Sequence, residues 1–139
     1  MIDAPRVCIL SIGDEILNGR IIDTNAAFLG AELLKLSMPV SHQRCTSDSP
    51  QQLTAQLMQM ASQFDLIISS GGLGPTADDR VYGEVEALQL EMTSIDNPAG
   101  SADGIMVQFS NGCHYLALPG PPIECQQTFT QSVVPLISD

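Results

Sequence analysis

The segment "SSGGLGPTADDR", residues 69–80, places a glycine-rich turn directly before two adjacent carboxylates. Gly71, Gly72 and Gly74 can adopt left-handed backbone angles, so the main chain can approach a ligand without interference from side chains. With a following helix capped by Thr76, their amide groups would form an anion site. We therefore predict a phosphate-binding loop, and the alternative is a turn that only reverses the chain.

The two carboxylates of this segment, Asp78 and Asp79, would not suit an anion site by themselves. In the first turn of a helix a carboxylate interacts favourably with the helix dipole, which is a sufficient structural reason for one of them. Adjacent helix positions diverge by about 100°, so the two side chains are expected to differ in role. A ligand that carries both a phosphate and hydrogen-bond donors, or a bridging divalent cation, would account for the other carboxylate.

Three further acids are candidates for the same site. Asp48 lies in "TSDSPQQ" just before a predicted helix, where Asp also serves as a helix cap. Asp14 and Glu15 follow Gly13 in a predicted loop and are either solvated acids or ligands of a divalent cation such as Mg²⁺. The residue types alone leave these alternatives open.

The elements that must position these residues follow from hydrophobic periodicity and turn signals. Short apolar runs predict strands, and apolar residues at spacings of three and four predict helices. An Asn-Gly pair between two short β-rich runs indicates a hairpin. The predicted elements are a strand at 6–12, a loop or short turn at 13–23, a helix at 24–35, a strand at 38–45, a helix starting at Ser49, a strand at 65–70, a helix capped by Thr76 and carrying Val81, Val85 and Leu88, a loop at 94–104, a hairpin with strands at 105–109 and 113–118, and a last helix reaching Pro135.

This order of strands and helices predicts a three-layer α/β sandwich with a mostly parallel sheet and a C-terminal β-hairpin. In such sheets ligands bind beyond the carboxyl ends of the strands. The loops that meet there contain Gly13, Ser70, Pro119 and Gly120 together with the glycine-rich turn, and Asp48 would be their neighbour. We predict that these residues line one ligand site.

The composition is that of a globular domain, with 44% hydrophobic residues over 139 positions, so residues 1–139 are expected to form a single domain. Five basic residues stand against sixteen acidic ones, a net charge of −11, and the basic residues are scattered. This pattern argues against a nucleic-acid partner. The apolar runs are too short to span a bilayer, and no leader pattern opens the chain, so a cytoplasmic protein without a membrane partner is expected. The four cysteines have no metal-ligand spacing and are expected to be free.

Three segments together resemble one family: "GDEILNGRIIDTNAAFLGAEL", "DLIISSGGLGPTADD" and "LALPGPPIE". The chain is similar to the N-terminal domain of CinA, the competence/damage-inducible protein, in the molybdopterin-binding superfamily that includes MogA, MoaB and a domain of MoeA. The motifs occur in the family's order and nearly span the chain. The resemblance implies the MogA-like fold, a ligand site at the strand ends and a homo-oligomer.

The resemblance also implies roles for two aspartates. Family members that make molybdenum cofactor bind the pterin phosphate at the glycine-rich loop and use one aspartate after it and one after the preceding strand. By motif these are Asp79 and Asp48. CinA-type domains are instead associated with metal-dependent hydrolysis of ADP-ribose and related nucleotide diphosphates.

The sequence departs from the family in two places. Arg80-Val81 stands where the family has Leu-Thr, and the segment near residues 90–97 is shorter than in relatives. We also expect residues 1–139 to include no C-terminal amidase domain.

Three functions stay open at this point. The first is a metal-dependent pyrophosphatase acting on nucleotide diphosphates such as ADP-ribose, with Asp14, Glu15 and Asp78 as candidate metal ligands and Asp48 and Asp79 as candidate catalytic residues. The second is a non-catalytic binder of molybdopterin or a related phosphorylated pterin. The third is a degenerate interaction module that retains only the fold. Fold alone does not choose among them.

Overall fold

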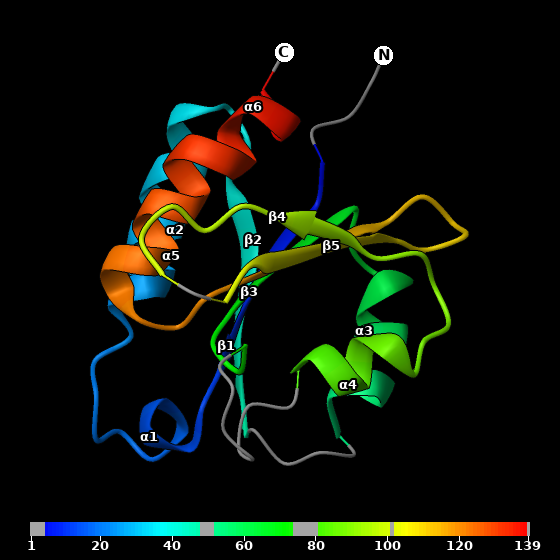
Figure 1. The fold of residues 1–139 in the computed structure, drawn as a ribbon, viewed down its shortest axis with the longest axis horizontal. Coiled ribbons are helices and arrows are strands. Elements are labelled where there is room, and N and C mark those ends of the chain that lie inside the picture. The colour runs from blue at the N-terminus through cyan, green and yellow to red at the C-terminus, as the bar shows by residue number, and fades with distance from the viewer. Residues whose placement is uncertain (1–4, 48–51, 74–80, 101, 139) are drawn as a thin grey trace.

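The computed structural model describes residues 5–47, 52–73, 81–100 and 102–138, which form a six-stranded sheet with helices on both faces (Figure 1). The strands are β1 Val7–Ile12, β2 Val40–Thr46, β3 Leu66–Ser70, β4 Thr93–Ile95, β5 Gly104–Gln108 and β6 His114–Leu118. The helical elements are α1 Asp14–Leu17, α2 Thr24–Lys35, α3 Gln52–Ala61, α4 Val81–Glu86, α5 Pro122–Thr128, the π-helical turn η1 Phe129–Val133 and α6 Val134–Ile137.

The sheet has the strand order β2-β1-β3-β6-β5-β4. β1 pairs in parallel with β2 and β3, and β3 pairs in parallel with β6. β5 is antiparallel to both β6 and β4. Every residue of β1 and β3 is buried, as expected for central parallel strands that are covered on both faces. The mostly parallel sheet with a C-terminal hairpin is thus confirmed.

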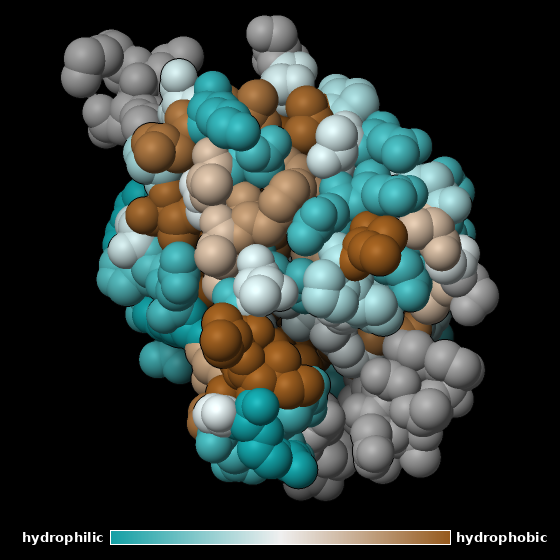
Figure 2. Space-filling model, turned by 90° about the vertical axis from the view of Figure 1, so that its left-hand side faces the viewer, coloured by the Kyte–Doolittle hydropathy of each residue, from teal (hydrophilic) through white to brown (hydrophobic). Residues whose placement is uncertain are grey.

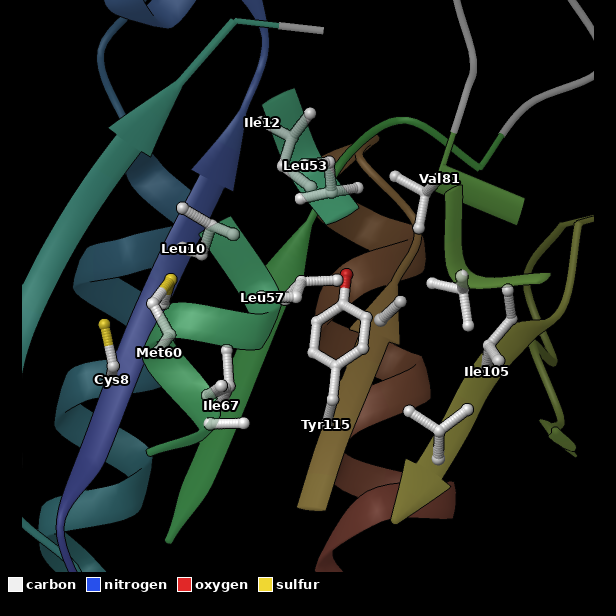
Figure 3. Packing of buried hydrophobic residues seen from close by; sticks show 14 of the residues in the cluster. Cys8, Leu10, Ile12, Leu53, Leu57, Met60, Ile67, Val81, Ile105 and Tyr115 are labelled. Carbon is white, nitrogen blue, oxygen red and sulfur yellow. The ribbon is translucent and has the colours of Figure 1, made fainter. Parts of the chain in front are cut away.

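Helices cover the two faces of the sheet and enclose a hydrophobic core on each (Figure 1). Alternate residues of β1 face opposite sides, so that Val7 and Ile9 pack with α2 and α5 while Cys8 and Leu10 pack with α3. Figure 3 shows Tyr115 among the side chains of the core on the α3 side of the sheet. Its hydroxyl shares a 2.6 Å hydrogen bond with Ser69 Oγ, and burial raises the pKa of Tyr115.

Helix α2 has the predicted bounds, 24–35, because its sequence carries both a helix-start signal and an apolar stripe. Asp23 caps the helix by accepting a hydrogen bond from the Ala26 amide at 3.0 Å. Leu29 and Leu33 on the apolar stripe are fully buried against the sheet. Local signals and tertiary burial therefore agree in this element.

Two predicted loops contain regular structure. Residues 94–104 were expected to be loop, but β4 occupies 93–95 and pairs with β5, and Gly104 begins β5. A strand of this length has too few residues to show a periodic pattern, and only its hydrogen-bonded neighbour defines it. Residues 14–17 form the short helix α1 within the predicted loop or turn.

Smaller differences concern element ends. The second strand covers 40–46 where 38–45 was predicted, and α4 ends at Glu86, before Leu88. The last helix continues past Pro135 to Ile137 and contains the π-helical turn η1. Pro135 has no N–H group to donate the regular helical hydrogen bond, so the backbone pattern must adjust around it. The predicted helix starts at Ser49 and Thr76 lie outside the described residues.

The cysteines and the helix lengths can be compared with what the sequence predicted. Cys8, Cys45, Cys113 and Cys125 are free, and only Cys45 is exposed. Within the described ranges, no helix combines the length and the apolar character that crossing a membrane would require.

Candidate functional site

A pocket with a volume of about 430 Å³ opens where β1 and β3 end, between α1, the start of α2 and the start of α5. This volume lies in the usual range for small-molecule sites. The described residues that line it are Ile12, Glu15, Ile16, Ile21, Ile22, Thr24, Asn25, Ser70, Gly71, Gly72, Leu73, Gly120, Pro121 and Pro122. They come from the loops after β1, β3 and β6, as the topology of a parallel sheet predicts.

Two glycines meet in the pocket lining. A Cβ atom on Gly120 would lie only 3.1 Å from the Cα of Gly71, so the two main chains are in direct contact. Gly71 has a φ of 100° and donates a hydrogen bond to Leu118 O at 3.1 Å. A side chain at Gly71 would also meet Ile12 O at 2.3 Å. The sequence is glycine here because both the backbone angle and the available space require it.

Asn25 ties the start of α2 to the loop after β6. Its Nδ2 donates a 2.8 Å hydrogen bond to Gly120 O, 95 residues further along the chain. Asn25 is only 6% exposed, and its Oδ1 is buried with no hydrogen-bond partner in the part of the chain that the structure describes. The Asn25 side chain therefore holds the loop after β6 against the start of α2, and its Oδ1 is an acceptor that this contact does not use.

Asp23 fixes the helix that carries Asn25. One carboxylate oxygen caps α2 through the Ala26 amide, and the other accepts a hydrogen bond from Ser11 Oγ in β1. The start of α2 is thus joined to the sheet as well as to the loop after β6. Because a carboxylate already occupies the positive end of this helix, an added anion would meet competition there.

The polar groups of the described lining include acceptors but no basic side chain. Glu15 supplies a carboxylate, and its Oε1 would lie 2.6 Å from a Cβ atom placed on Gly13, so the side chain folds back over that glycine. A phosphate bound here would depend on backbone amides rather than on Lys or Arg.

One side of the pocket is apolar. Ile16, Ile21 and Ile22 line it, and Ile22 is 83% exposed. On the face shown in Figure 2, hydrophobic surface gathers in the lower part of the molecule, where Figure 1 places α1. A planar ring could lie against such a surface while its polar substituents reach the opposite wall.

The structure brings together only part of the residue set predicted from sequence. Five predicted residues line the pocket: Glu15, Ser70, Gly71, Gly72 and Gly120. Three others lie beside the pocket without lining it: Gly13 just before α1, Asp14 at the first position of α1, and Pro119 in the loop after β6. Five lie outside the described residues: Asp48, Gly74, Thr76, Asp78 and Asp79.

The predicted divalent-cation site has no counterpart in the described part of the chain. No group of three or more His, Cys, Asp or Glu side chains is arranged there to hold a metal ion. Of the two predicted metal ligands within the described residues, Asp14 and Glu15, Glu15 lines the pocket. The described residues do not form a metal centre, so no chemical step through a metal follows from them.

Sequence reasoning did not select Asn25, although a signal for it exists. Asn25 lies four and eight residues before Leu29 and Leu33, so it continues their buried stripe. A polar residue on the buried stripe of a helix needs a hydrogen-bond partner. That requirement could have identified Asn25 as a site residue, whereas its bond to Gly120 depends on the tertiary fold.

The model of the probable molybdopterin binding domain family matches residues 8–139, almost the whole chain. The chain belongs to this family. Two curated relatives are competence-damage inducible proteins, one from Clostridium perfringens with 33% identity and one from Levilactobacillus brevis with 34%. The matches cover 94% and 93% of the chain but only 40% of each relative. The chain is thus a CinA-like domain that spans about two fifths of the relatives' length.

Solved structures show the same fold. The protein CinA from Thermoplasma acidophilum, described as of unknown function, superposes with a TM-score of 0.82 at 26% identity, over 91% of this chain and 95% of that one. The molybdopterin biosynthesis enzyme MoaB from Thermus thermophilus gives a TM-score of 0.81 at 21% identity, over 96% and 91%. The MogA-like three-layer fold is therefore confirmed.

Proposed function

We propose that this CinA-like domain binds a small molecule that combines a phosphate with a heterocycle, either a pterin such as molybdopterin or a nucleotide diphosphate such as ADP-ribose. The observation that carries the proposal is the pocket itself, in which the close contact of Gly71 with Gly120 faces an apolar side of isoleucines. A ligand without a phosphate would leave the backbone of the glycine-rich turn without a partner, and a ligand without a ring would leave the isoleucine side chains uncovered. Membership of a molybdopterin-binding family supports the same reading.

In this proposal the ring of the ligand lies against Ile21 and Ile22, and its phosphate lies near the glycine-rich loop. Asp79 and Asp48 keep the roles that the family resemblance implies, reading ring substituents or acting in catalysis. Gly74 and Thr76 would complete the phosphate loop. These assignments on residues outside the described ranges rest on sequence.

Hydrolysis of a nucleotide diphosphate is a second candidate function, favoured by the carboxylate of Glu15 in the pocket lining. Together with Asp14, Asp48, Asp78 and Asp79 it supplies the acids that a metal-assisted route would need. The binding proposal does not depend on hydrolysis, so the two are tested separately.

The test is calorimetric titration of the purified domain with ADP-ribose in EDTA, followed by measurement of AMP release in Mg²⁺, Mn²⁺ or Co²⁺. We expect the wild type to bind and Ile22→Asp to bind at least about fivefold more weakly, because a charge replaces apolar contact worth about 1 kcal/mol. Leu34→Asp is the matched control, since Leu34 is 64% exposed and does not line the pocket.

Turnover that disappears in Asp79→Ala would establish the hydrolase, and binding without turnover would leave a binding domain. If the wild type binds neither ADP-ribose nor molybdopterin, the degenerate module takes the place of this proposal. The homo-oligomer and the cytoplasmic location stay predictions, which sedimentation of the purified domain and fractionation of cells would check.

A further inference from the structure

Asn25 and Asn111 make similar hydrogen bonds but differ in the acceptor half of their amides. Each donates from Nδ2 to a distant backbone carbonyl at 2.8 Å, Asn25 to Gly120 O and Asn111 to Ala61 O. The Oδ1 of Asn111 accepts a hydrogen bond from the Cys113 amide at 3.1 Å. The Oδ1 of Asn25 is buried and accepts none.

The orientation of the Asn25 amide follows from its neighbour. Turning the amide over would place Oδ1 against the carbonyl oxygen of Gly120, and two acceptors cannot bond to each other. The turned amide would also leave its NH₂ group without this partner. The unused atom of Asn25 is therefore the acceptor oxygen.

An unsatisfied acceptor opposes folding, and the apolar stripe of α2 would accommodate an aliphatic residue at this position. Ala26 and Leu29 beside it are buried among hydrophobic residues. Asn25 differs from them because it lines the pocket. The bond to Gly120 accounts for its donor, and no group among the described residues accounts for its acceptor.

We propose that Asn25 is a specificity-determining residue whose Oδ1 accepts a hydrogen bond from an N–H or O–H group on the ring or sugar of the bound ligand. The inference rests on the proposed function and narrows it to ligands that present such a donor beside their phosphate. Glu15 makes the lining still richer in acceptors, and no basic side chain of the described lining competes for them.

This oxygen is almost completely shielded from solvent in the structure. In this proposal a donor of the ligand therefore reaches it only after a local rearrangement of the pocket lining.

The experiment compares two probes on four proteins in EDTA. ADP-ribose carries ring and sugar donors as well as phosphates, whereas inorganic pyrophosphate has phosphates but no ring or sugar donor. The proteins are the wild type, Asn25→Ala, Asn25→Asp and Asn111→Ala. Asn111→Ala removes an equivalent 2.8 Å bond far from the pocket and controls for loss of stability. Dissociation constants are measured by calorimetry and folding by circular dichroism.

We expect Asn25→Ala to weaken ADP-ribose binding at least tenfold and pyrophosphate binding less than threefold. Asn25→Asp retains an acceptor oxygen but loses the bond to Gly120, so it should bind ADP-ribose more tightly than Asn25→Ala does. Asn111→Ala should bind both probes like the wild type while melting at a lower temperature.

Unchanged ADP-ribose binding in Asn25→Ala, or an equal loss for both probes, would overturn the role of Oδ1 and leave Asn25 as a structural tether. If pyrophosphate does not bind the wild type, the comparison of the two Asn25 variants decides, and tighter or equal binding by the alanine variant overturns the proposal. A wild type that binds neither of these probes nor molybdopterin removes the proposed function as well. These results are therefore distinguishable.

Discussion

The carboxyl end of the parallel strands and the opposite end of the sheet contain similar residue types but use them differently. At the carboxyl end Asn25 leaves its acceptor oxygen unpartnered, whereas at the opposite end Asn111 uses both halves of its amide. Gly71 is packed directly against backbone, whereas Gly112 has open space where a Cβ atom would lie. The carboxyl end is closely packed around a buried acceptor without a partner, whereas at the opposite end the polar groups of Asn111 are hydrogen-bonded.

Pocket size alone would favour the opposite end of the sheet. A second pocket of about 510 Å³ lies beside the starts of β3 and β6, and it is larger than the candidate site. In its lining, the Asp65 carboxylate accepts a hydrogen bond from the Arg6 amide at 2.8 Å, and the main-chain carbonyl oxygen of Asp65 accepts one from the His114 amide at 3.0 Å. The difference between the ends teaches that unused polar groups, rather than volume, distinguish a candidate ligand site from a packing defect.

The largest effect is expected from alanine at the two glycines. Both have left-handed angles, with φ of 100° at Gly71 and 97° at Gly112. Gly112→Ala should cost about 1–2 kcal/mol for the backbone angle alone. Gly71→Ala adds a 2.3 Å contact with Ile12 O, so it should cost at least about 3 kcal/mol. Urea unfolding measures both, and equal losses would show that the carboxyl end is not more tightly packed.

The next effect concerns the cap that holds α2 at the carboxyl end. Asp23→Ala removes the bonds to Ala26 and Ser11 and should lower the free energy of unfolding by about 1–2 kcal/mol. Asp23→Asn keeps a capping oxygen and should lose less than half of that amount. If the two variants lost equally, the charge rather than the cap would be the stabilising feature.

The dependence of the melting temperature on pH compares the two ends of the sheet, because each has a buried cysteine thiol nearby. Burial raises the pKa of Cys113 near the hairpin turn from 9.0 to about 11, and that of Cys125 in α5 to about 12. Because a raised pKa means that the folded state holds the proton more tightly, the stabilisation is complete below pH 9 and is lost as pH rises towards these values. The melting temperature of Cys113→Ala should therefore fall less steeply between pH 9 and 11 than that of the wild type. Parallel slopes would contradict the assignment.

The smallest effect is expected where α2 ends, away from the site. Lys35 and Glu32 form a 2.7 Å ion pair, but the Lys35 side chain is 72% exposed. Lys35→Ala should change the free energy of unfolding by less than about 0.5 kcal/mol. Measuring thermal unfolding of Lys35→Ala and Asp23→Ala together compares the stability contributed by the two ends of α2. A loss as large as that of Asp23→Ala would mean that the ends of α2 are equally important.

The sequence by itself determined the elements whose signals are local. The spacing of apolar residues predicted the bounds of α2, continuous apolar runs predicted β1 and β3, and Asn111-Gly112 indicated the hairpin. The order of the predicted elements placed Gly71, Gly72 and Gly120 in loops at one end of the sheet, and all three line the pocket. These features are readable because each depends on residues close together in the chain.

Only the tertiary structure decided the features that need partners from distant segments. β4 exists because β5 supplies its hydrogen bonds, and a three-residue run shows no pattern without them. The role of Asn25 depends on Gly120, 95 residues away, and on the absence of a partner for its other amide atom. The spacing of Asn25 along α2 could mark it as a buried polar residue, but hydrogen-bond satisfaction is a property of the folded arrangement. The sequence could therefore not show which of its amide atoms would lack a partner.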